Sequence, residues 1–338
     1  MPSEGISTMK TTKTMKTTNS KVVPRITTEG RTPLQDVIPL DTPYLVFLDP
    51  SDICNAHCFF CPSGDPGLLK QVGRKPQIMD FDLYGKILAD LCNMPRPIKT
   101  LRMYKDGEPL LNPLFPEMVR LAKDTSRFGQ IDTTTNGLLL GPKMNDRLVW
   151  SGLDKIFISV PFAYDLEYIK NVRDLYRKGR HRLHVHVKMI IDGVPKAREM
   201  NFMETFGGIS DSISVEHMAP CWPEGKTLPV NRRWNIYGQP LPKKAVKVCP
   251  YIFYSLAINS DGTVSLCFLD WKHIYIVGDL KKQNFWEIWN GETLKWLRRT
   301  HLRGERKTAL MCRDCGQLRY GAPDNIDAYA KDILRRPL

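Results

Sequence analysis

The chain has 338 residues, of which 42% are hydrophobic and 25% are charged. These values are ordinary for a soluble globular protein, and the length suits one large domain or a large domain with a small appendage. No apolar run approaches the roughly 18–20 residues that a membrane-spanning helix needs. Composition therefore excludes a protein with transmembrane helices, and we expect a cytoplasmic location.

The formal net charge is +13. An excess of Lys and Arg supports nonspecific phosphate binding, but the positive residues are spread along the chain and no nucleic-acid-binding motif is present. A solvated basic surface explains the charge most simply. The alternatives are an anionic small-molecule substrate and an acidic electron-transfer partner, whereas neither nucleic acid nor a membrane is an expected partner.

The N-terminus is rich in Thr, Ser and Lys and lacks the apolar stretch of a signal peptide. We expect residues 1–40 to form a disordered, basic extension outside the fold.

Strand and helix patterns alternate after this extension. The predicted strands are Tyr44–Leu48, Lys99–Met103, Gln130–Thr134, Lys155–Val160, Leu183–Ile191 and Ser212–Glu216. The predicted helices are Asp80–Leu91, Pro113–Lys123, Lys143–Trp150, Leu166–Arg177 and Lys196–Phe206. Such alternation implies parallel strands joined by right-handed crossovers. Six units fall short of eight, so we expect an α/β fold, a partial (β/α)6 TIM-like barrel over residues 41–217, with its active site at the C-terminal ends of the strands.

The pattern changes after the barrel. A Pro-rich, basic connector over residues 218–248 has no periodicity. Tyr251–Cys267 indicates a β-hairpin, and the second half of Gly278–Arg303 has an apolar helical face. We expect residues 249–325 to form a small α+β domain that a metal cluster helps to hold together, followed by a tail over 326–338.

Nine cysteines carry the strongest functional signal, since clustered cysteines in a cytosolic chain favour metal over disulfides. Cys54, Cys58 and Cys61 form a C-x3-C-x2-C run directly after the first predicted strand. Three thiolates can hold three irons of a 4Fe–4S cube and leave the fourth iron without a protein ligand. The alternative is a zinc site, for which His57 would be a geometrically awkward fourth ligand.

This spacing in this position resembles the signature of the radical S-adenosylmethionine (SAM) superfamily. The resemblance implies that a reduced cluster cleaves SAM and that the resulting 5′-deoxyadenosyl radical abstracts a hydrogen atom from the substrate. It also implies a SAM-binding role for Phe60, which precedes the third cysteine and would lie beside the adenine.

Further SAM contacts follow from the same resemblance. The turn Asp106-Gly107-Glu108-Pro109 is similar to the family's Gly-Gly-Glu-type motif, with Asp106 in place of the first glycine. Gly107 and Glu108 would then hold the methionyl amino group. Ser159 and Asn136 match positions that contact the ribose or the carboxylate, although they can equally be ordinary polar groups at strand ends.

Four later cysteines form a second set, Cys249, Cys267, Cys312 and Cys315. Their spacing resembles the SPASM domain in its shortened form, the twitch domain, and implies one auxiliary 4Fe–4S cluster. Four thiolates ligate every iron of a cube, so its expected role is electron transfer. A four-cysteine zinc ribbon is the alternative.

The twitch-containing enzymes that this chain resembles, butirosin-type aminocyclitol dehydrogenases among them, act on carbohydrate-like alcohols in antibiotic biosynthesis. The resemblance implies a radical SAM oxidoreductase that converts an alcohol to a ketone and passes an electron to the auxiliary cluster. Arg232, Arg233 and Glu216 are candidates to orient or deprotonate the hydroxyl group or to hold an anionic group, although the two arginines are more simply surface residues. The expected reductant is a flavodoxin or ferredoxin, and the substrate is a small molecule such as an anionic sugar derivative.

Two alternatives stay open. Cys221 lies just past the last barrel strand, where a thiol could return a hydrogen atom to a substrate radical. That would make the enzyme a redox-neutral epimerase, and dehydratase or decarboxylase chemistry on a sugar derivative belongs to the same class. The other alternative is modification of a ribosomal peptide.

Overall fold

The computed structural model describes residues 20–27, 29–223 and 233–338. Its strands form a ten-stranded sheet in the order β1-β7-β6-β5-β4-β3-β2-β8-β9-β10. The strands are β1 (Lys21–Val22), β2 (Leu45–Leu48), β3 (Ile98–Arg102), β4 (Phe128–Thr135), β5 (Lys155–Ser159), β6 (His184–Ile190), β7 (Ser212–Glu216), β8 (Ser255–Ile258), β9 (Thr263–Ser265) and β10 (Ile276–Asp279).

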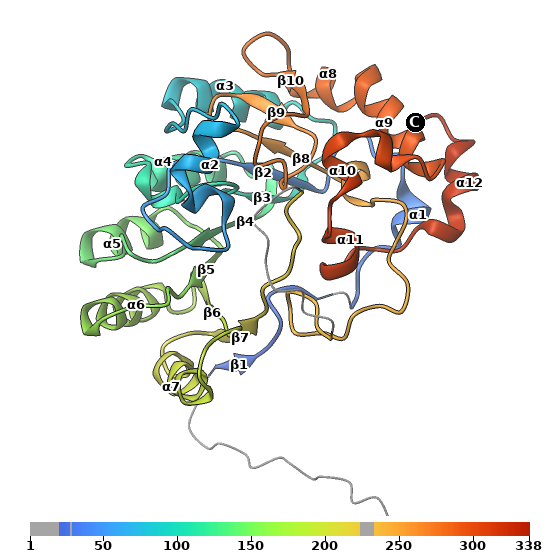
Figure 1. Ribbon diagram of the computed structural model, residues 1–338. Helices are drawn as coiled ribbons and strands as arrows, with labels where there is room; N and C mark the ends of the chain where they lie inside the picture. The colour runs from blue at the N-terminus through green and yellow to red at the C-terminus, as the bar shows by residue number, and fades with distance from the viewer. Residues whose placement is uncertain (1–19, 28, 224–232) are drawn as a thin grey trace, which may run out of the picture.

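Helices cover one side of this sheet along its barrel part and gather around its far end (Figure 1). The helices are α1 (Leu34–Val37), α2 (Pro66–Gln71), α3 (Phe81–Cys92), α4 (Phe115–Asp124), α5 (Pro142–Trp150), α6 (Leu166–Gly179), α7 (Lys196–Gly207), α8 (Phe285–Trp289), α9 (Glu292–Leu302), α10 (Leu310–Arg313), α11 (Gln317–Tyr320) and α12 (Ala330–Leu334). Among the residues described, no helix combines the length and apolar character that crossing a membrane requires.

Strands β2 to β7 form the predicted partial barrel. Each pairs in parallel with the next, and α3 to α7 provide the crossovers on the outer side (Figure 1). Asp80 caps α3 by accepting a hydrogen bond from the amide of Leu83 at 2.9 Å, as its position before an apolar helical pattern predicts. The expectation of a (β/α)6-type barrel is confirmed.

Strand β6 shows how the barrel separates its two faces. Val185, Val187 and Met189 are buried in the apolar core, whereas His186 and Lys188 meet polar partners on β7. Because side chains alternate along a strand, one face of β6 packs against helices and the other lines a polar barrel interior.

The second region extends the sheet of the barrel. Strand β8 pairs in parallel with β2, and β9 pairs in antiparallel fashion with β8, which confirms the predicted hairpin. Strand β10 follows at the edge. Helices α8 and α9 occupy the second half of the segment where an apolar helical face was expected. The two regions therefore share one continuous sheet.

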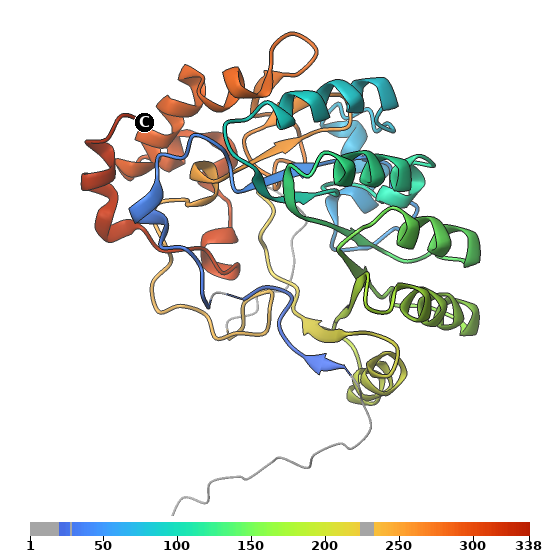
Figure 2. The same cartoon turned by 180° about the vertical axis from the view of Figure 1, so that it is seen from behind.

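The N-terminal segment differs from expectation. Residues 20–27 and 29–40, which we assigned to a disordered extension, have a definite place: β1 pairs in parallel with β7, and Leu34 of α1 is buried in the core. Both views show β1 beside β7 (Figures 1 and 2). Backbone pairing and a few polar side chains hold residues 20–27, and isolated apolar residues such as Leu34 and Ile38 hold the rest, so no apolar periodicity marks the segment in the sequence. Residues 1–19 and 28 of the expected extension lie outside the described residues.

Candidate active site

The first cysteine set lies on the loop that follows β2, at the C-terminal ends of the barrel strands. The Cys61 amide donates to the Cys58 carbonyl at 3.1 Å, which folds the loop into a tight turn. Burial raises the pKa of the Cys54 thiol to about 11, and the nearby Cys61 adds to the shift. Burial also raises the pKa of Cys58 and of Cys61, each of which is influenced by another thiol of the set. The three sulfurs thus lie close enough to act on one another.

The turn after β3 packs directly onto this loop. A Cβ atom at Gly107 would lie 2.2 Å from the carbonyl oxygen of Ser51 and 2.5 Å from that of Ile53. Such distances are far below a van der Waals contact, so only glycine allows this approach. The next residue, Glu108, donates its amide to the Ile53 carbonyl at 2.8 Å.

The Glu108 carboxylate joins the ends of β3 and β4. It accepts hydrogen bonds from the Thr135 hydroxyl and the Asn136 amide, each at 2.7 Å, and the residue is 2% exposed. Burial raises the pKa of Glu108, and these donors oppose the shift. Asn136 in turn donates its side-chain amide to Asn55 at 2.8 Å. Of the expected SAM contacts, Gly107, Glu108 and Asn136 therefore come together around the cysteine loop.

Phe60 belongs to an aromatic group at the same end of the barrel. Its ring lies 5.4 Å from that of Phe59 and 6.3 Å from that of Phe162, which follows β5. Ser159, the last residue of β5, pairs with Lys188 of β6. Phe162 was missed in the sequence because no motif marks it.

A buried ionic cluster made of Arg25, Lys188 and Glu216 lies inside the barrel. Lys188 Nζ and Arg25 Nε each lie 2.7 Å from a different oxygen of Glu216. Burial by itself raises the pKa of Glu216, but the charges of Arg25 and Lys188 outweigh it and lower the pKa. Burial lowers the pKa of Lys188, an effect that Glu216 opposes. The site therefore holds an ionised carboxylate away from water.

Tyrosines complete the surroundings of this cluster. Arg25 Nη1 donates to the Tyr104 hydroxyl at 3.4 Å, and its guanidinium lies over the Tyr237 ring, 5.3 Å from the centroid. His186 bridges the hydroxyls of Ser212 and Ser214 on β7, at 2.8 and 2.9 Å. Burial lowers the pKa of His186 to about 3, so the imidazole is neutral.

Of this cluster, sequence analysis identified Glu216 and missed Arg25 and Lys188. The alternation of His184, His186 and Lys188 with apolar residues along β6 is the signal that marks Lys188. Nothing in the sequence marks Arg25, because its role depends on the pairing of β1 with β7.

The second cysteine set gathers where the hairpin, the start of the 3₁₀ segment Tyr251–Phe253 and α10 meet. Cys267 and Cys312 are buried, whereas Cys249 and Cys315 are half-buried. Burial raises the pKa of all four thiols. Each of the other three thiols raises the pKa of Cys267 further, because the four thiols lie near one another.

Both sets fit iron–sulfur clusters in number and in kind of ligand. Three thiols lie on one loop and four in the other group, and thiolates are the ligands of such clusters. Among the described residues, no three His, Cys, Asp or Glu side chains converge as the ligands of one metal ion do. A cube of four irons takes one thiolate on each iron, so its ligands surround it instead of sharing one centre. Metal binding would ionise these thiols.

Of the other predicted catalytic residues, Cys221 lies near the second cysteine set and Arg233 lies at the surface. Cys221 is buried, and its carbonyl lies 3.8 Å from Cys315 Sγ. Arg233 is exposed and its guanidinium lies 5.7 Å from the centre of the Trp234 ring. Arg232 lies outside the described residues. The structure therefore places Glu216 and Cys221, but not Arg233, inside the molecule.

A buried charge network joins the two regions. Asp106 forms ion pairs with Lys105 and with Arg74, and its Oδ2 lies 2.9 Å from His273 Nε2. Arg74 also donates to the Trp271 carbonyl. Burial opposes ionisation of Asp106, but the charge of Lys105 and the contact with His273 hold its pKa well below the usual range. Asp106, the departure from the glycine of the family motif, thus bonds the turn after β3 to the loop after Cys267.

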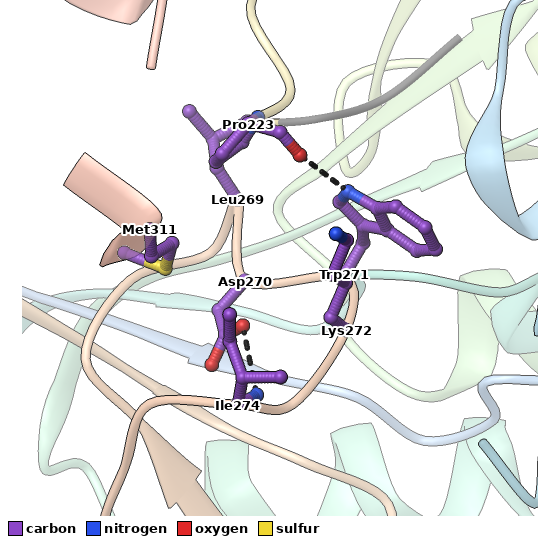
Figure 3. Close-up of a pocket in the computed structure, with 7 residues that line it drawn as sticks. All are labelled: Pro223, Leu269, Asp270, Trp271, Lys272, Ile274 and Met311. Atoms are coloured by element: carbon purple, nitrogen blue, oxygen red, sulfur yellow. Dashed lines mark hydrogen bonds between the residues drawn. The ribbon is translucent and has the colours of Figure 1, made fainter. Parts of the chain in front are cut away.

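That loop also encloses a small hollow, shown in Figure 3. The Trp271 indole donates to the Pro223 carbonyl at 3.0 Å, and Asp270 accepts from the amide of Ile274 at 3.1 Å. The hollow has a volume of about 10 Å³, room for a single water at most. The hydrogen bond from Trp271 to Pro223 fastens the connector to the second region, and the hollow is too small to hold a substrate.

Comparison with known proteins follows the same division of the chain. Residues 48–210 match the model of the radical SAM superfamily, and residues 249–316 match that of the SPASM iron–sulfur cluster-binding domain. Curated relatives include GTP 3′,8-cyclases. That of Chlorobaculum tepidum is 36% identical over 107 residues, which cover 32% of this chain and 29% of the relative. That of a Synechococcus species is 29% identical over 164 residues, 46% and 44% of the two chains. The chain thus matches less than half the length of these relatives.

Solved structures of similar fold include BtrN in complex with AdoMet and 2-DOIA, with a TM-score of 0.55 and 17% identity over 80% of this chain and 92% of that chain. Streptococcus suis SuiB bound to the precursor peptide SuiA has a TM-score of 0.59 and 12% identity, with coverages of 85% and 72%. Native anSMEcpe with bound AdoMet has a TM-score of 0.55 and 12% identity, with coverages of 86% and 96%. At these identities the likeness shows a common fold.

Proposed function

Since this chain is a radical SAM enzyme that carries a SPASM domain, we propose that it oxidises an alcohol group of a carbohydrate-like or aminocyclitol substrate to a ketone, in a cytoplasmic pathway of natural-product biosynthesis. The radical SAM domain binds a 4Fe–4S cluster and SAM, and the SPASM domain binds auxiliary iron–sulfur. When bound, these groups supply a 5′-deoxyadenosyl radical that removes the carbinol hydrogen atom and an acceptor for the second electron. The hydroxyl proton goes to a base of the protein.

The observation that carries this proposal is the buried, ionised carboxylate of Glu216 at the C-terminal end of β7. The first cysteine set follows the C-terminal end of β2, at the same edge of the parallel barrel strands. A substrate on Glu216 would therefore lie at the edge of the barrel where hydrogen abstraction is expected.

Glu216 is the protein group suited to receive the hydroxyl proton. Its Oε2 accepts from Lys188, and its Oε1 forms an ion pair with Arg25 Nε at 2.7 Å. Because a carboxylate has about four lone-pair sites, an ionised, buried carboxylate with one partner on each oxygen can still accept a hydrogen bond from a substrate hydroxyl and then its proton. We assign the remaining roles by the same proposal: the first cysteine set holds the SAM cluster, Phe60, Gly107, Glu108, Asn136 and Ser159 surround SAM, and the second set holds one auxiliary cluster.

Substitution of Glu216 by Gln tests the assignment of the base. We expect Glu216→Gln to lower the rate of ketone formation by about 10²–10⁴-fold and to leave cleavage of SAM to 5′-deoxyadenosine measurable. The readouts are product analysis by mass spectrometry and deoxyadenosine release. A variant that forms ketone at the wild-type rate would remove Glu216 from this role.

Iron analysis tests the cluster assignment. We expect about eight irons in the anaerobically reconstituted wild type and about four after Cys54, Cys58 and Cys61 are replaced by Ala. A wild type that holds only about four irons together with zinc would contradict an auxiliary electron acceptor.

A redox-neutral reaction is the second candidate, because Cys221 is 5% exposed and its carbonyl oxygen lies 3.8 Å from Cys315 Sγ of the second cysteine set. As an epimerase, the enzyme would introduce solvent deuterium into the product and form no ketone, and Cys221→Ala would abolish that uptake. The relatives named GTP 3′,8-cyclase keep a third class open, ring formation on a nucleotide, which would give neither ketone nor solvent deuterium.

A further inference from the structure

The buried cluster of Arg25, Lys188 and Glu216 contains two cations for one carboxylate. The exposed fractions of the three side chains are 17%, 9% and 7%. Within the described residues, no salt bridge joins Arg25 or Lys188 to a second carboxylate. The neighbouring pair of Arg102 and Asp132 balances its own charge. The cluster therefore has an excess positive charge in a place where an unbalanced charge is costly.

Its hydrogen bonds are incomplete as well. Arg25 Nε lies 2.7 Å from Glu216 Oε1, although the two are poorly aligned for a hydrogen bond. The hydrogen bond of Arg25 Nη1 to the Tyr104 hydroxyl is long, at 3.4 Å. Buried donors without well-aligned acceptors are rare, and a water, an ion or a ligand can supply the missing acceptor. The planar guanidinium presents its donors in a fork that matches two oxygens of a carboxylate or a phosphate.

We propose that Arg25 and Lys188 bind an oxyanion, a carboxylate or a phosphate ester carried by the substrate, and that the segment 20–27 is thereby part of the substrate site. The bound anion neutralises the excess charge and gives the Arg25 donors their acceptors. Strand β1 delivers Arg25 to this position by pairing with β7, the strand that ends in Glu216. This inference rests on the proposed function in one respect, that the ligand of the barrel interior is the substrate.

Equilibrium dialysis of the anaerobically reconstituted enzyme at constant ionic strength tests the proposal without turnover. The probes are inorganic phosphate, glucose 6-phosphate, glucuronate and uncharged glucose. We expect one saturable site for at least one of the three anions and none for glucose. The preference between glucose 6-phosphate and glucuronate then identifies the phosphate or the carboxylate as the recognised group.

Variants locate that site. We expect Arg25→Gln to weaken anion binding at least tenfold and Arg25→Lys, which keeps the charge and loses the fork, to weaken it less. Lys21→Gln removes an exposed charge from the same segment and is expected to leave binding unchanged. Iron content and SAM-dependent deoxyadenosine release show whether each variant is folded and whether the enzyme acts on SAM.

The outcomes separate the two proposals. Absence of a saturable anion site, or a site that Arg25→Gln leaves intact or that Lys21→Gln weakens equally, would overturn the oxyanion site. If anions bind through Arg25 but no ketone forms from any alcohol, the oxyanion site stands and the proposed oxidation fails.

Discussion

At the scale of single residues, the chemistry depends on a few positions where the backbone comes unusually close. Gly107 lies in the turn after β3 and touches the backbone of the cysteine loop, where a Cβ atom would lie 2.2 Å from the Ser51 carbonyl oxygen. The same turn contains Asp106, whose side chain points into the charge network with Lys105 and His273. One residue therefore shapes the cysteine loop and its neighbour fastens the turn.

Replacement of Gly107 by Ala is expected to displace the cysteine loop, because the added methyl group meets backbone and not a movable side chain. We expect a loss of about 1–3 kcal/mol in the free energy of unfolding and fewer irons bound by the first cysteine set. Gly85→Ala is the matched control: it lies within α3, nothing lies within 4 Å of its added Cβ, and it is expected to stabilise by about 0.5–1 kcal/mol. Thermal unfolding and iron analysis measure both. Equal iron content in the two variants would contradict the role of Gly107.

A second residue-scale prediction concerns Arg306, which donates to the Cys312 carbonyl and whose charge opposes the raised pKa of Cys312 and of Cys315. A cation favours the more negative, reduced state of a nearby cluster, and net charge sets cluster potentials. Arg306→Gln is therefore expected to lower the reduction potential of the auxiliary cluster, measured by redox titration with electron paramagnetic resonance. Arg303→Gln, at an exposed site at the C-terminal end of α9, is the control. An unchanged potential in Arg306→Gln would exclude this influence.

At the scale of elements, β1 matters more than its two residues imply. Its backbone pairs with β7. The hydroxyl of Ser20, just before β1, shares its hydrogen between the buried carbonyl oxygens of Gly207 and Ser210, at 2.6 and 2.5 Å. This polar anchor positions the segment that reaches Arg25. A short strand held by one ladder and one hydroxyl opens more easily than the central strands.

Loss of this anchor is expected to loosen β1 without unfolding the barrel. Ser20→Ala removes hydrogen bonds whose net contribution is about 0.5–1.5 kcal/mol, so we expect hydrogen exchange at the Val23 amide, which donates to the Ile213 carbonyl at 3.1 Å, to quicken several-fold. The control is Lys21→Ala, whose side chain is exposed. Mass spectrometry of peptides over 20–27 reports the change, and identical exchange in both variants would show that the ladder alone holds β1.

At the scale of the whole molecule, one continuous sheet runs through the two regions that carry the cysteine sets. Strand β8 continues the barrel beyond β2, and the network of Asp106, Arg74 and His273 bonds the turn after β3 to the loop after Cys267. The separation of the two sets is thus determined by hydrogen-bonded strands and by buried charges, and not by a flexible linker.

Removal of Asp106 tests this connection. Asp106→Ala leaves Lys105 and Arg74, whose side chains are 0% and 4% exposed, without this carboxylate. Breaking a buried pair by removing one partner costs about 3–5 kcal/mol, so we expect a clearly lower unfolding temperature and faster proteolysis in residues 267–275. Glu204→Ala, an exposed carboxylate of α7, is the control. A stability equal to that of the control would show that the network does not join the regions.

The sequence by itself determined the features that depend on local spacing: the cysteine sets, the alternation that builds the barrel, and the hairpin around residues 259–262. These features can be predicted because strand and helix periods and ligand spacings depend on residues that are close together in the sequence. Only the tertiary structure decided the place of Arg25, the pairing of Lys188 with Glu216, and the role of Asp106. Each of these depends on contacts between segments far apart in the chain, and a charged side chain acquires its function from the partner and the burial that folding gives it.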